Sequence, residues 1–184
     1  MQGRLLRLWK GTLVMMDIQE GLIITIGAPG AGKSTWAKKN LPAHCLRLER
    51  DRFRECIFGT RRKYHSHHFS HEERSKIVTD SMMAAFHAWP QHCWAVTDTG
   101  LEYKAVRPFI EAALFRLVPV TFVIFERTAE YLKQVNRYRP IPHRIPDEEL
   151  AKRIDWFNAP DAWWRQLDDD QCPNFRFMDG TACS

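Results

Sequence analysis

The residues with the clearest chemical meaning stand in one short segment, residues 27–34, whose sequence GAPGAGKS matches the pattern G-x-x-x-x-G-K-[ST]. Glycines let the backbone N–H groups of such a loop turn inward, where they form a concavity for phosphate oxygens. Lys33 would then reach the β- and γ-phosphates of a nucleotide, and the Ser34 hydroxyl would ligate Mg²⁺. The pattern therefore predicts a site for ATP, or GTP, with Mg²⁺, and the predicted binding residues are Gly27, Ala28, Pro29, Gly30, Ala31, Gly32, Lys33, Ser34 and Thr35.

The sequence on both sides of this loop fits such a site. Residues 22–26 form an apolar, β-branched run, which suits a strand buried on both faces of a parallel sheet. Residues 35–39, TWAKK, begin a helix directly after the loop. Strand, glycine loop and helix therefore follow one another in the order that the pattern requires.

A carboxylate among arginines follows the next predicted strand, residues 44–48. The carboxylate is Asp51, and it lies between Arg50, Arg52 and Arg54. At the carboxyl edge of a parallel sheet it can accept the proton of an attacking hydroxyl, and the arginines would keep it ionised and attract a phosphorylated substrate. In the alternative interpretation, Asp51 only caps a helix that begins at Arg52.

Three further residues have a predicted role at the same edge. Asp98 ends an apolar strand, where a carboxylate reaches either the water shell of Mg²⁺ or the acceptor; alternatively it caps the following helix. Arg137 and Arg139 are cations of the kind that stabilise a phosphoryl-transfer transition state, and the alternative is a solvated basic face.

Strand and helix patterns alternate along the chain and predict an α/β fold with a mainly parallel sheet covered on both faces. Ser70 and Glu73 form an S-x-x-E capping box at the start of one helix. Trp89, Trp94 and Trp156 fit apolar faces and are predicted to lie in the core. The predicted strands are 22–26, 44–48, 93–98, 118–126 and part of 174–179, and the later helices are 106–117, 128–138 and 146–158.

Composition favours one catalytic domain with an anionic partner. A chain of 184 residues with 45% hydrophobic and 27% charged residues has ordinary globular values. Lys and Arg total 27 against 22 Asp and Glu, and this balance of +5 suits nucleotide or nucleic acid. We expect residues 1–19 to be an extension of unknown order and residues 20–184 to form the domain. No apolar stretch approaches the roughly 20 residues that span a bilayer.

Cysteine and histidine spacing does not indicate a structural metal site. The five cysteines include no C-x-x-C pair, as expected of reduced cytosolic thiols. Four histidines, His65, His67, His68 and His71, stand close together before the capping box. Zinc sites need convergent geometry, so a polar loop that touches substrate or solvent is the preferred interpretation of these histidines.

Several motifs together resemble the bacteriophage-type polynucleotide 5′-kinase family. ITIGAPGAGKSTWA, ERDRFRE, IVTDSM, AVTDTGL and VNRYRP occur in that family's order and with similar separations, over roughly residues 22–157. The resemblance implies a P-loop NTPase-type fold with a helical lid. It also implies that Asp51 is the general base, that Arg54 binds the phosphate next to the acceptor nucleotide, that Asp98 organises the acceptor site, and that Arg139 clamps the donor phosphates.

The sequence departs from this family's pattern at two positions. Gly100 stands where the family usually has an asparagine after Asp-Thr. Gln134 and Val135 stand where the lid carries an additional basic residue, so Arg137 is expected to supply that charge. Larger members also carry a phosphatase domain with a D-x-D-G-T motif. Here only DGT is present, at residues 179–181, and we interpret it as coincidence.

These observations predict a cytoplasmic, ATP- and Mg²⁺-dependent kinase, in the host cytoplasm if a phage encodes it, that acts on a hydroxyl of a nucleic acid. The 5′-hydroxyl of a DNA or RNA end is the preferred acceptor, and Arg50, Arg54 and Asp98 are the predicted substrate-binding residues. Three alternatives stay open: a kinase of a hydroxymethyl group on a modified DNA base, a small-metabolite or nucleoside kinase, and a nucleotide-dependent binding protein without transfer. We expect no membrane contact, and the oligomeric state is left open.

Overall fold

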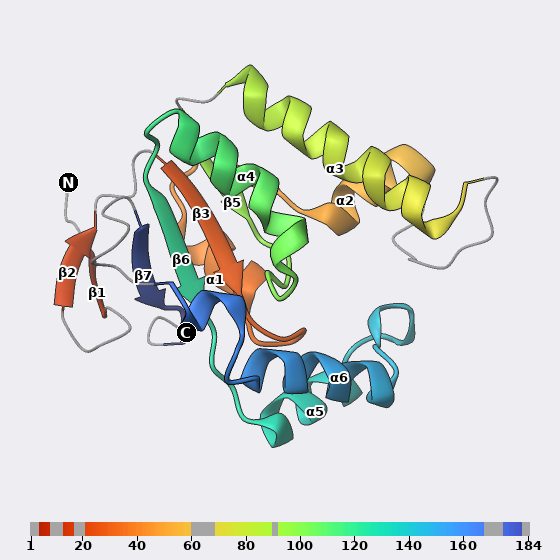
Figure 1. The fold of residues 1–184 in the computed structure, drawn as a ribbon. Helices are drawn as coiled ribbons and strands as arrows, with labels where there is room; N and C mark the ends of the chain where they lie inside the picture. Colours follow the sequence, from red (N-terminus) through yellow and green to blue (C-terminus); the bar gives the residue numbers. More distant parts are fainter. Residues whose placement is uncertain are drawn as a thin grey trace.

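A five-stranded, all-parallel sheet forms the centre of the molecule (Figure 1). The computed structural model describes residues 4–7, 13–16, 21–59, 69–89, 92–167 and 175–181. In spatial order, the strands are β4 (Leu46–Leu48), β5 (Cys93–Val96), β3 (Gly21–Ile26), β6 (Val120–Ile124) and β7 (Phe175–Asp179). Each strand falls within or at one of the five predicted segments, so the predicted α/β class is confirmed.

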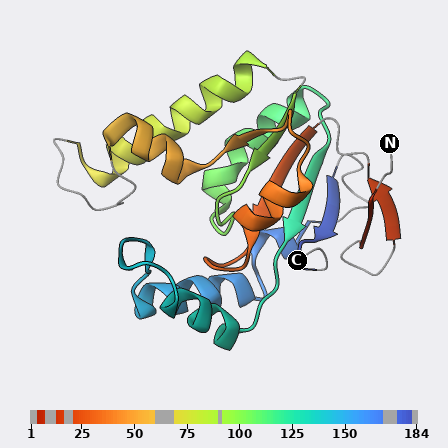
Figure 2. The same ribbon diagram turned by 180° about the vertical axis from the view of Figure 1, so that it is seen from behind.

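Helices cover both faces of the sheet because its central strand is apolar on both sides. All six residues of β3 are buried. Leu22, Ile24 and Ile26 pack in one core cluster with side chains of α3 (His71–Ala88) and α4 (Tyr103–Phe115). Ile23 packs in a second cluster with Trp36 of α1 (Lys33–Asn40), on the opposite face (Figures 1 and 2). The two-residue period of a strand thus sends alternate side chains to the two cores.

Capping hydrogen bonds fix the start of α3, and the helix that carries Asp51 begins before that residue. The Ser70 hydroxyl accepts from the Glu73 N–H at 3.2 Å, and the Glu73 carboxylate accepts from the Ser70 N–H at 2.7 Å. This is the predicted capping box, and it begins α3. The helix α2 (Arg50–Phe58) begins at Arg50 with Glu49 as N-cap, two residues before the start considered from the sequence. Asp51 therefore lies within the first turn of α2 and is not its cap.

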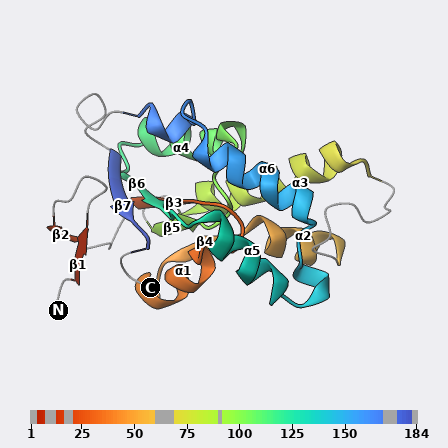
Figure 3. The same cartoon turned by 90° about the horizontal axis from the view of Figure 1, so that it is seen from below.

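Two helices form the lid, which lies at the carboxyl edge of the sheet (Figures 1 and 3). They are α5 (Ala129–Arg137) and α6 (Asp147–Asn158), joined through the short 3₁₀ helix η1 (Ile141–His143). Leu132 of α5 and Ile154 of α6 belong to the same core cluster as α1. A second 3₁₀ helix, η2 (Trp163–Arg165), follows the lid and leads back to the sheet.

Two of the three tryptophans predicted in the core are exposed. Trp94 is buried, but Trp89 is 56% exposed and Trp156 is 48% exposed. Trp89 is the C-cap of α3, and its carbonyl accepts the indole N–H of Trp94 at 2.7 Å. Trp156 lies on the outer side of α6, with the Arg153 guanidinium carbon 5.4 Å from its ring centre. Trp89 thus contributes a backbone carbonyl and Trp156 a ring face to a neighbour, although neither side chain lies in the core.

Residues 1–19 contain an antiparallel pair of strands, β1 (Arg4–Arg7) and β2 (Leu13–Met16). β1 lies beside β7, the edge strand of the main sheet (Figure 1). The division of the chain into an extension and a kinase domain remains a prediction. Among the described residues, no helix is long and apolar enough to cross a membrane.

Candidate active site at the carboxyl edge of the sheet

The predicted phosphate loop connects β3 to α1 and leaves the start of α1 open to an anion. Gly32 is the N-cap of α1 and has a left-handed backbone, with φ of 102°, which favours glycine. The helix has no side-chain cap bond at this end and no acidic residue in its first turn. The N–H groups of the first turn, with the positive end of the helix dipole, therefore suit phosphate oxygens. Ser34 and Thr35 lie in this turn and are exposed.

Lys33 is folded onto the loop that precedes it. Its ammonium group donates to the carbonyl oxygens of Gly27 at 2.8 Å and Ala28 at 2.9 Å. The residue is only 7% exposed. The pKa of Lys33 is lowered to about 7, chiefly by burial and in smaller part by the positive charges of Arg139 and Arg153, while the charge of Asp98 acts in the opposite direction. An anionic phosphate would stabilise the ammonium form, so the structure fits a lysine that binds a nucleotide.

The residues present also fit Mg²⁺ held through substrate phosphates. Mg²⁺ prefers oxygen ligands and usually takes only one or two from the protein. The exposed Ser34 hydroxyl is such a ligand at the start of α1. Among the described residues, no group of three or more His, Cys, Asp or Glu side chains is arranged to hold a metal ion. His71 is the first residue of α3, while His65, His67 and His68 lie outside the described residues.

Asp51 is an exposed carboxylate that is held by a buried arginine. Its side chain is 72% exposed, and it forms an ion pair with the Arg54 guanidinium one turn later on α2. The Arg54 side chain is only 10% exposed. This arrangement fixes the Asp51 carboxylate on the surface while keeping it available to another molecule. It also means that Arg54 contacts Asp51 directly, a contact that sequence analysis does not predict.

Asp98 and Arg50 hold the start of α2 against the end of β5. The Asp98 carboxylate accepts the Arg50 backbone N–H at 3.0 Å and the Arg50 Nε–H at 3.3 Å. Arg50 also donates to the Thr79 hydroxyl of α3 at 2.7 Å. Asp98 therefore caps α2, which precedes it in the chain, whereas sequence analysis considered a cap on the following helix. Through this network the strand end positions the helix that carries Asp51.

Electrostatic coupling connects the two halves of the site. Burial raises the pKa of Asp98, and the negative charge of Asp51 raises it further, although Arg50 opposes both. Asp98 in turn favours the protonated form of Lys33. Hydrogen bonds place these groups at the same edge of the sheet: the Thr25 hydroxyl donates to the Asp98 carbonyl at 3.1 Å, and the Gly27 N–H of the phosphate loop donates to the Thr99 carbonyl at 2.9 Å. The structure thus brings together the predicted donor and acceptor residues.

Gly100 packs against the backbone of β3. It has φ of +63°, and a Cβ atom there would lie 2.5 Å from the Thr25 carbonyl oxygen. The Gly100 carbonyl accepts the indole N–H of Trp163 at 3.1 Å. Gly100 stands where the polynucleotide kinase family usually has an asparagine, and in this chain that position has no room for a side chain. The loop after Asp98 is fixed by a close backbone contact instead.

The lid helix α5 contacts the phosphate loop directly. A Cβ atom on Gly30 would lie 3.4 Å from Val135, 3.8 Å from Leu132 and 3.8 Å from the Arg139 guanidinium. Arg139 is partly buried, and burial lowers its pKa. Its role as a clamp on the donor phosphates stays a prediction. Val135, which stands where the family has a basic residue, fills the space against Gly30.

Arg137 and Arg153 differ in their relation to the phosphate loop. Arg137 is exposed at the end of α5, and its backbone carbonyl accepts from the Arg144 guanidinium. Arg153 of α6 has a side chain that is 17% exposed, and Glu149 binds it through two hydrogen bonds of 2.8 and 2.9 Å. The charge of Arg153 also acts on Lys33. Sequence analysis does not single out Arg153; the only signal is its Glu149 partner at the i,i+4 spacing.

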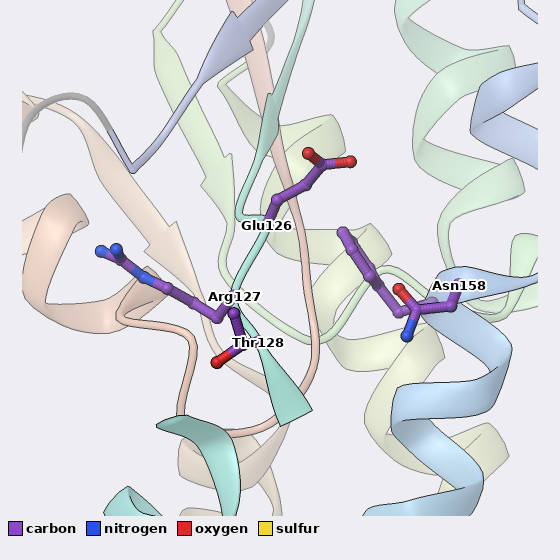
Figure 4. Close-up of a pocket in the computed structure, with 5 residues that line it drawn as sticks. Glu126, Arg127, Thr128 and Asn158 are labelled. Carbon is purple, nitrogen blue, oxygen red and sulfur yellow. The ribbon is translucent and has the colours of Figure 1, made fainter. Parts of the chain in front are cut away.

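A separate open pocket lies at the base of the lid. The pocket has a volume of about 310 Å³. Arg127 and Asn158 lie on opposite sides of it, and the Arg127 side chain points away from Asn158 (Figure 4). The predicted site residues are not among those that line it. The lining residues are Glu126, Arg127, Thr128, Phe157 and Asn158.

Comparison with known proteins gives one family match. A family model described as an AAA domain matches residues 22–160 of the chain. Among curated proteins, no significant match was found.

Solved structures of similar fold include two chains from Pnkp1/Rnl/Hen1 complexes. One, from the structure of the RNA repair complex, is 22% identical with a TM-score of 0.55 over 76% of this chain. The other is 24% identical with a TM-score of 0.48 over 67% of this chain. This chain spans 44% and 40% of their lengths.

Chaetomium thermophilum Kti12 in complex with ADP-AlF3 is similar over a larger share of both chains. It is 13% identical with a TM-score of 0.55, over 86% of this chain and 88% of Kti12. At these identities the likeness concerns the fold, and it confirms the predicted P-loop NTPase-type architecture. The family match together with the phosphate-loop pattern implies nucleotide binding.

Proposed function

The chain belongs to the AAA domain family, and on that premise we propose that it is an ATP- and Mg²⁺-dependent kinase that phosphorylates a hydroxyl of a nucleic acid, preferably the 5′-hydroxyl of a strand end. The observation that carries this proposal is the Asp51 carboxylate, which is exposed yet held by buried Arg54. A protein that only binds nucleotide needs no such base beside its phosphate loop. A kinase needs one to accept the proton of the attacking hydroxyl.

On the donor side, the loop amides and Lys33 bind the β- and γ-phosphates. Mg²⁺, when bound at the Ser34 hydroxyl, would neutralise charge on these phosphates. Arg139 lies against the same loop, with its guanidinium 3.8 Å from the Cβ position of Gly30. A fixed cation at this point stabilises the charge that develops on the transferred group.

On the acceptor side, the hydroxyl oxygen attacks the γ-phosphorus while the bond from that phosphorus to the bridging oxygen of ADP breaks. The hydroxyl proton passes to the Asp51 carboxylate. Arg54 keeps Asp51 in place, and Asp98 with Arg50 positions the helix start that carries it. Arg50 and Asp98 thus support the acceptor site through α2, and a direct contact with substrate remains a prediction.

Arg153 is the better candidate for the second lid cation. The family pattern led to the expectation that Arg137 replaces a missing basic residue. However, Arg153 is the more buried side chain, is held by Glu149, and acts electrostatically on Lys33. We therefore assign the second cation to Arg153 on α6, in addition to Arg139, which follows α5.

Three observations support a nucleic acid as acceptor. The chain carries a net charge of +5, which favours a polyanion. The motifs that resemble polynucleotide kinases include the segments of Asp51, Asp98 and Arg139. A neighbour in fold comes from an RNA repair complex. A cytoplasmic setting also fits, because the described cysteines, Cys45, Cys56 and Cys93, are free.

The proposal is tested by locating the label after incubation with γ-labelled ATP and Mg²⁺. The acceptor panel contains DNA and RNA oligonucleotides with a 5′-hydroxyl or a 5′-phosphate, an oligonucleotide with an internal hydroxymethylated base, and a free nucleoside. We expect label at the 5′ end of the 5′-hydroxyl strands and none on the 5′-phosphate strands. Label on the internal base or chiefly on the nucleoside would replace the strand-end acceptor, and no label on any acceptor would exclude this function.

A further inference from the structure

Asn136 is a buried polar residue whose side chain bonds to a distant part of the lid. It is 2% exposed in the last turn of α5. Its side-chain amide donates to the Ile145 carbonyl oxygen at 2.8 Å, and its side-chain oxygen accepts from the Ile145 N–H at 3.1 Å. The two bonds satisfy both main-chain groups of Ile145. They close the segment 137–144 into a loop with fixed ends.

The loop that Asn136 closes contains Arg139. The Arg139 backbone N–H donates to the Asn136 carbonyl at 3.2 Å, so the two residues are joined through the main chain as well. Within the same loop, the Arg144 guanidinium donates to the Arg137 carbonyl. The loop therefore has an internal set of bonds that determines where the Arg139 side chain begins.

The position of Arg139 requires such support. Its guanidinium lies against Gly30 of the phosphate loop and is partly buried. This contact is kept only if the Arg139 side chain stays in one position. An arginine has several rotatable bonds and loses conformational entropy when it is held in one place. A preorganised cation stabilises a transition state because it need not move during the reaction. If the ends of the loop 137–144 were not fixed, Arg139 would no longer be preorganised, even though the residue itself is unchanged.

We propose that Asn136 is a positioning residue for phosphoryl transfer: its amide fixes the loop 137–144 at Ile145 and thereby holds the Arg139 guanidinium at the phosphate loop. This proposal rests on the proposed kinase function. Asn136 is not assigned a contact of its own with the nucleotide. It acts through Arg139, and this dependence can be measured.

The test is a double-mutant cycle with Asn136→Ala, Arg139→Ala and the double variant. We expect Arg139→Ala to lower kcat by about 10²- to 10³-fold, in the range for removal of one transition-state donor. Asn136→Ala should lower kcat by about ten- to a hundredfold with little change in the KM of the oligonucleotide. In the Arg139→Ala background, Asn136→Ala should have almost no further effect, because the residue through which it acts is absent.

A structural role alone predicts a different result. If Asn136 only stabilises the lid, its removal lowers kcat by the same factor in both backgrounds, and multiplicative effects would overturn the proposal. Gln166→Ala is a matched control, because Gln166 also donates from a side-chain amide to a main-chain carbonyl, that of Asp161, at 2.7 Å and outside the lid. We expect this control to keep the wild-type kcat.

Two additions keep the test decisive. If Asn136→Ala does not fold, Asn136→Leu takes its place in the cycle, since leucine has nearly the same shape, fills the buried space and removes both hydrogen bonds to Ile145. The cycle is also measured by calorimetric binding of ATP with Mg²⁺ in the absence of nucleic acid. Non-additive losses of ATP affinity would support the role of Asn136 even if no acceptor is phosphorylated. Additive losses of ATP affinity, with a wild-type protein that does phosphorylate an oligonucleotide, would overturn the role of Asn136 and leave the kinase function standing.

Discussion

At the scale of single residues, the site combines features that the sequence predicts with contacts that it does not. The loop pattern around Lys33 identifies a phosphate site because the pattern specifies both residue types and spacing. The partner of Asp98 was beyond sequence analysis, since Asp98 caps α2 from a strand 48 residues later in the chain. Arg153 has no motif at all, and only folding brings its charge near Lys33.

The pKa of Lys33 leads to a prediction for ATP binding. In the free protein this pKa is about 7, so the amine is largely neutral above that pH. Bound phosphate favours the ammonium form, and binding above pH 7 must therefore take up a proton. Between pH 7.5 and 9, where the triphosphate is fully ionised, we expect the affinity for ATP to fall by up to about tenfold per pH unit.

Calorimetry at pH 8.5 in two buffers of different ionisation enthalpy measures this proton uptake. Lys33→Met should abolish it, whereas Lys38→Met, an exposed lysine of the same helix, should not. An affinity that is independent of pH in this range, with no uptake of protons, would contradict the assignment.

The ion pair of Asp51 and Arg54 predicts how Arg54→Ala affects different acceptors. Because Arg54 holds the base, its removal should lower kcat for a nucleoside 3′-phosphate and for a bare nucleoside by a similar factor, about ten- to a hundredfold. Parallel assays with the two acceptors measure this. A loss confined to the 3′-phosphate acceptor would show instead that Arg54 reads the neighbouring phosphate, as the family resemblance implies.

The lid arginines are separated by a comparison of Arg153→Met with Arg137→Met. We expect Arg153→Met to lower kcat by about tenfold or more, because it removes a cation that acts on the phosphate site. Arg137→Met should have a smaller effect, since that side chain is exposed. Arg107→Met is a matched control, because Arg107 also pairs with a glutamate at the i,i+4 spacing but lies on α4. Equal effects of the two lid variants would contradict our assignment.

At the scale of elements, the strands and helices were predictable because hydrophobic period and capping chemistry are local properties. The start of α2 was placed less well, since its N-cap residue, Glu49, makes no side-chain cap bond and the carboxylate that accepts the Arg50 N–H comes from Asp98. The exposure of Trp89 and Trp156 was also missed. Trp89 follows the last turn of α3, and Trp156 lies off the stripe of α6 that buries Leu150, Ile154 and Phe157, so an apolar residue type alone did not place either side chain.

The loop after β5 packs closely against β3 because Gly100 has no side chain. A comparison of Gly100 with Gly59, a glycine of similar φ in open space, tests this. Gly59 has a similar φ of +68° but nothing within 4 Å of its Cβ position, whereas Gly100 would bring a Cβ to 2.5 Å from the Thr25 oxygen. We expect Gly59→Ala to destabilise by about 1 kcal/mol from the backbone conformation alone. Gly100→Ala should cost about 1–3 kcal/mol more because of the contact.

Urea unfolding of the two variants measures this difference. Equal losses of stability would show that the β3 backbone can move away and that the close approach is not important. Gly100→Asn should behave like the alanine variant, because the amide of the family's asparagine does not relieve a contact at Cβ.

At the scale of the whole molecule, the sequence predicts a parallel sheet but not the order of its strands. The order β4-β5-β3-β6-β7 brings the ends of β3, β4 and β5 together, and so places the phosphate loop, α2 and Asp98 at one edge. The packing of the lid on Gly30 is likewise a product of tertiary structure. The sequence therefore identifies the parts of a kinase, and the fold determines which charges act on one another.

The central claim is that Asp51 activates a nucleic acid hydroxyl, and one measurement tests it most directly. Single-turnover transfer from γ-labelled ATP to a 5′-hydroxyl oligonucleotide is compared for the wild type, Asp51→Asn and Asp80→Asn. Asp80 is a suitable control, because it is also an exposed helical aspartate that pairs with a cation, Lys76. We predict that Asp51→Asn loses about 10²–10⁴-fold in rate with ATP affinity unchanged, while Asp80→Asn transfers normally. A wild-type rate for Asp51→Asn would contradict the account.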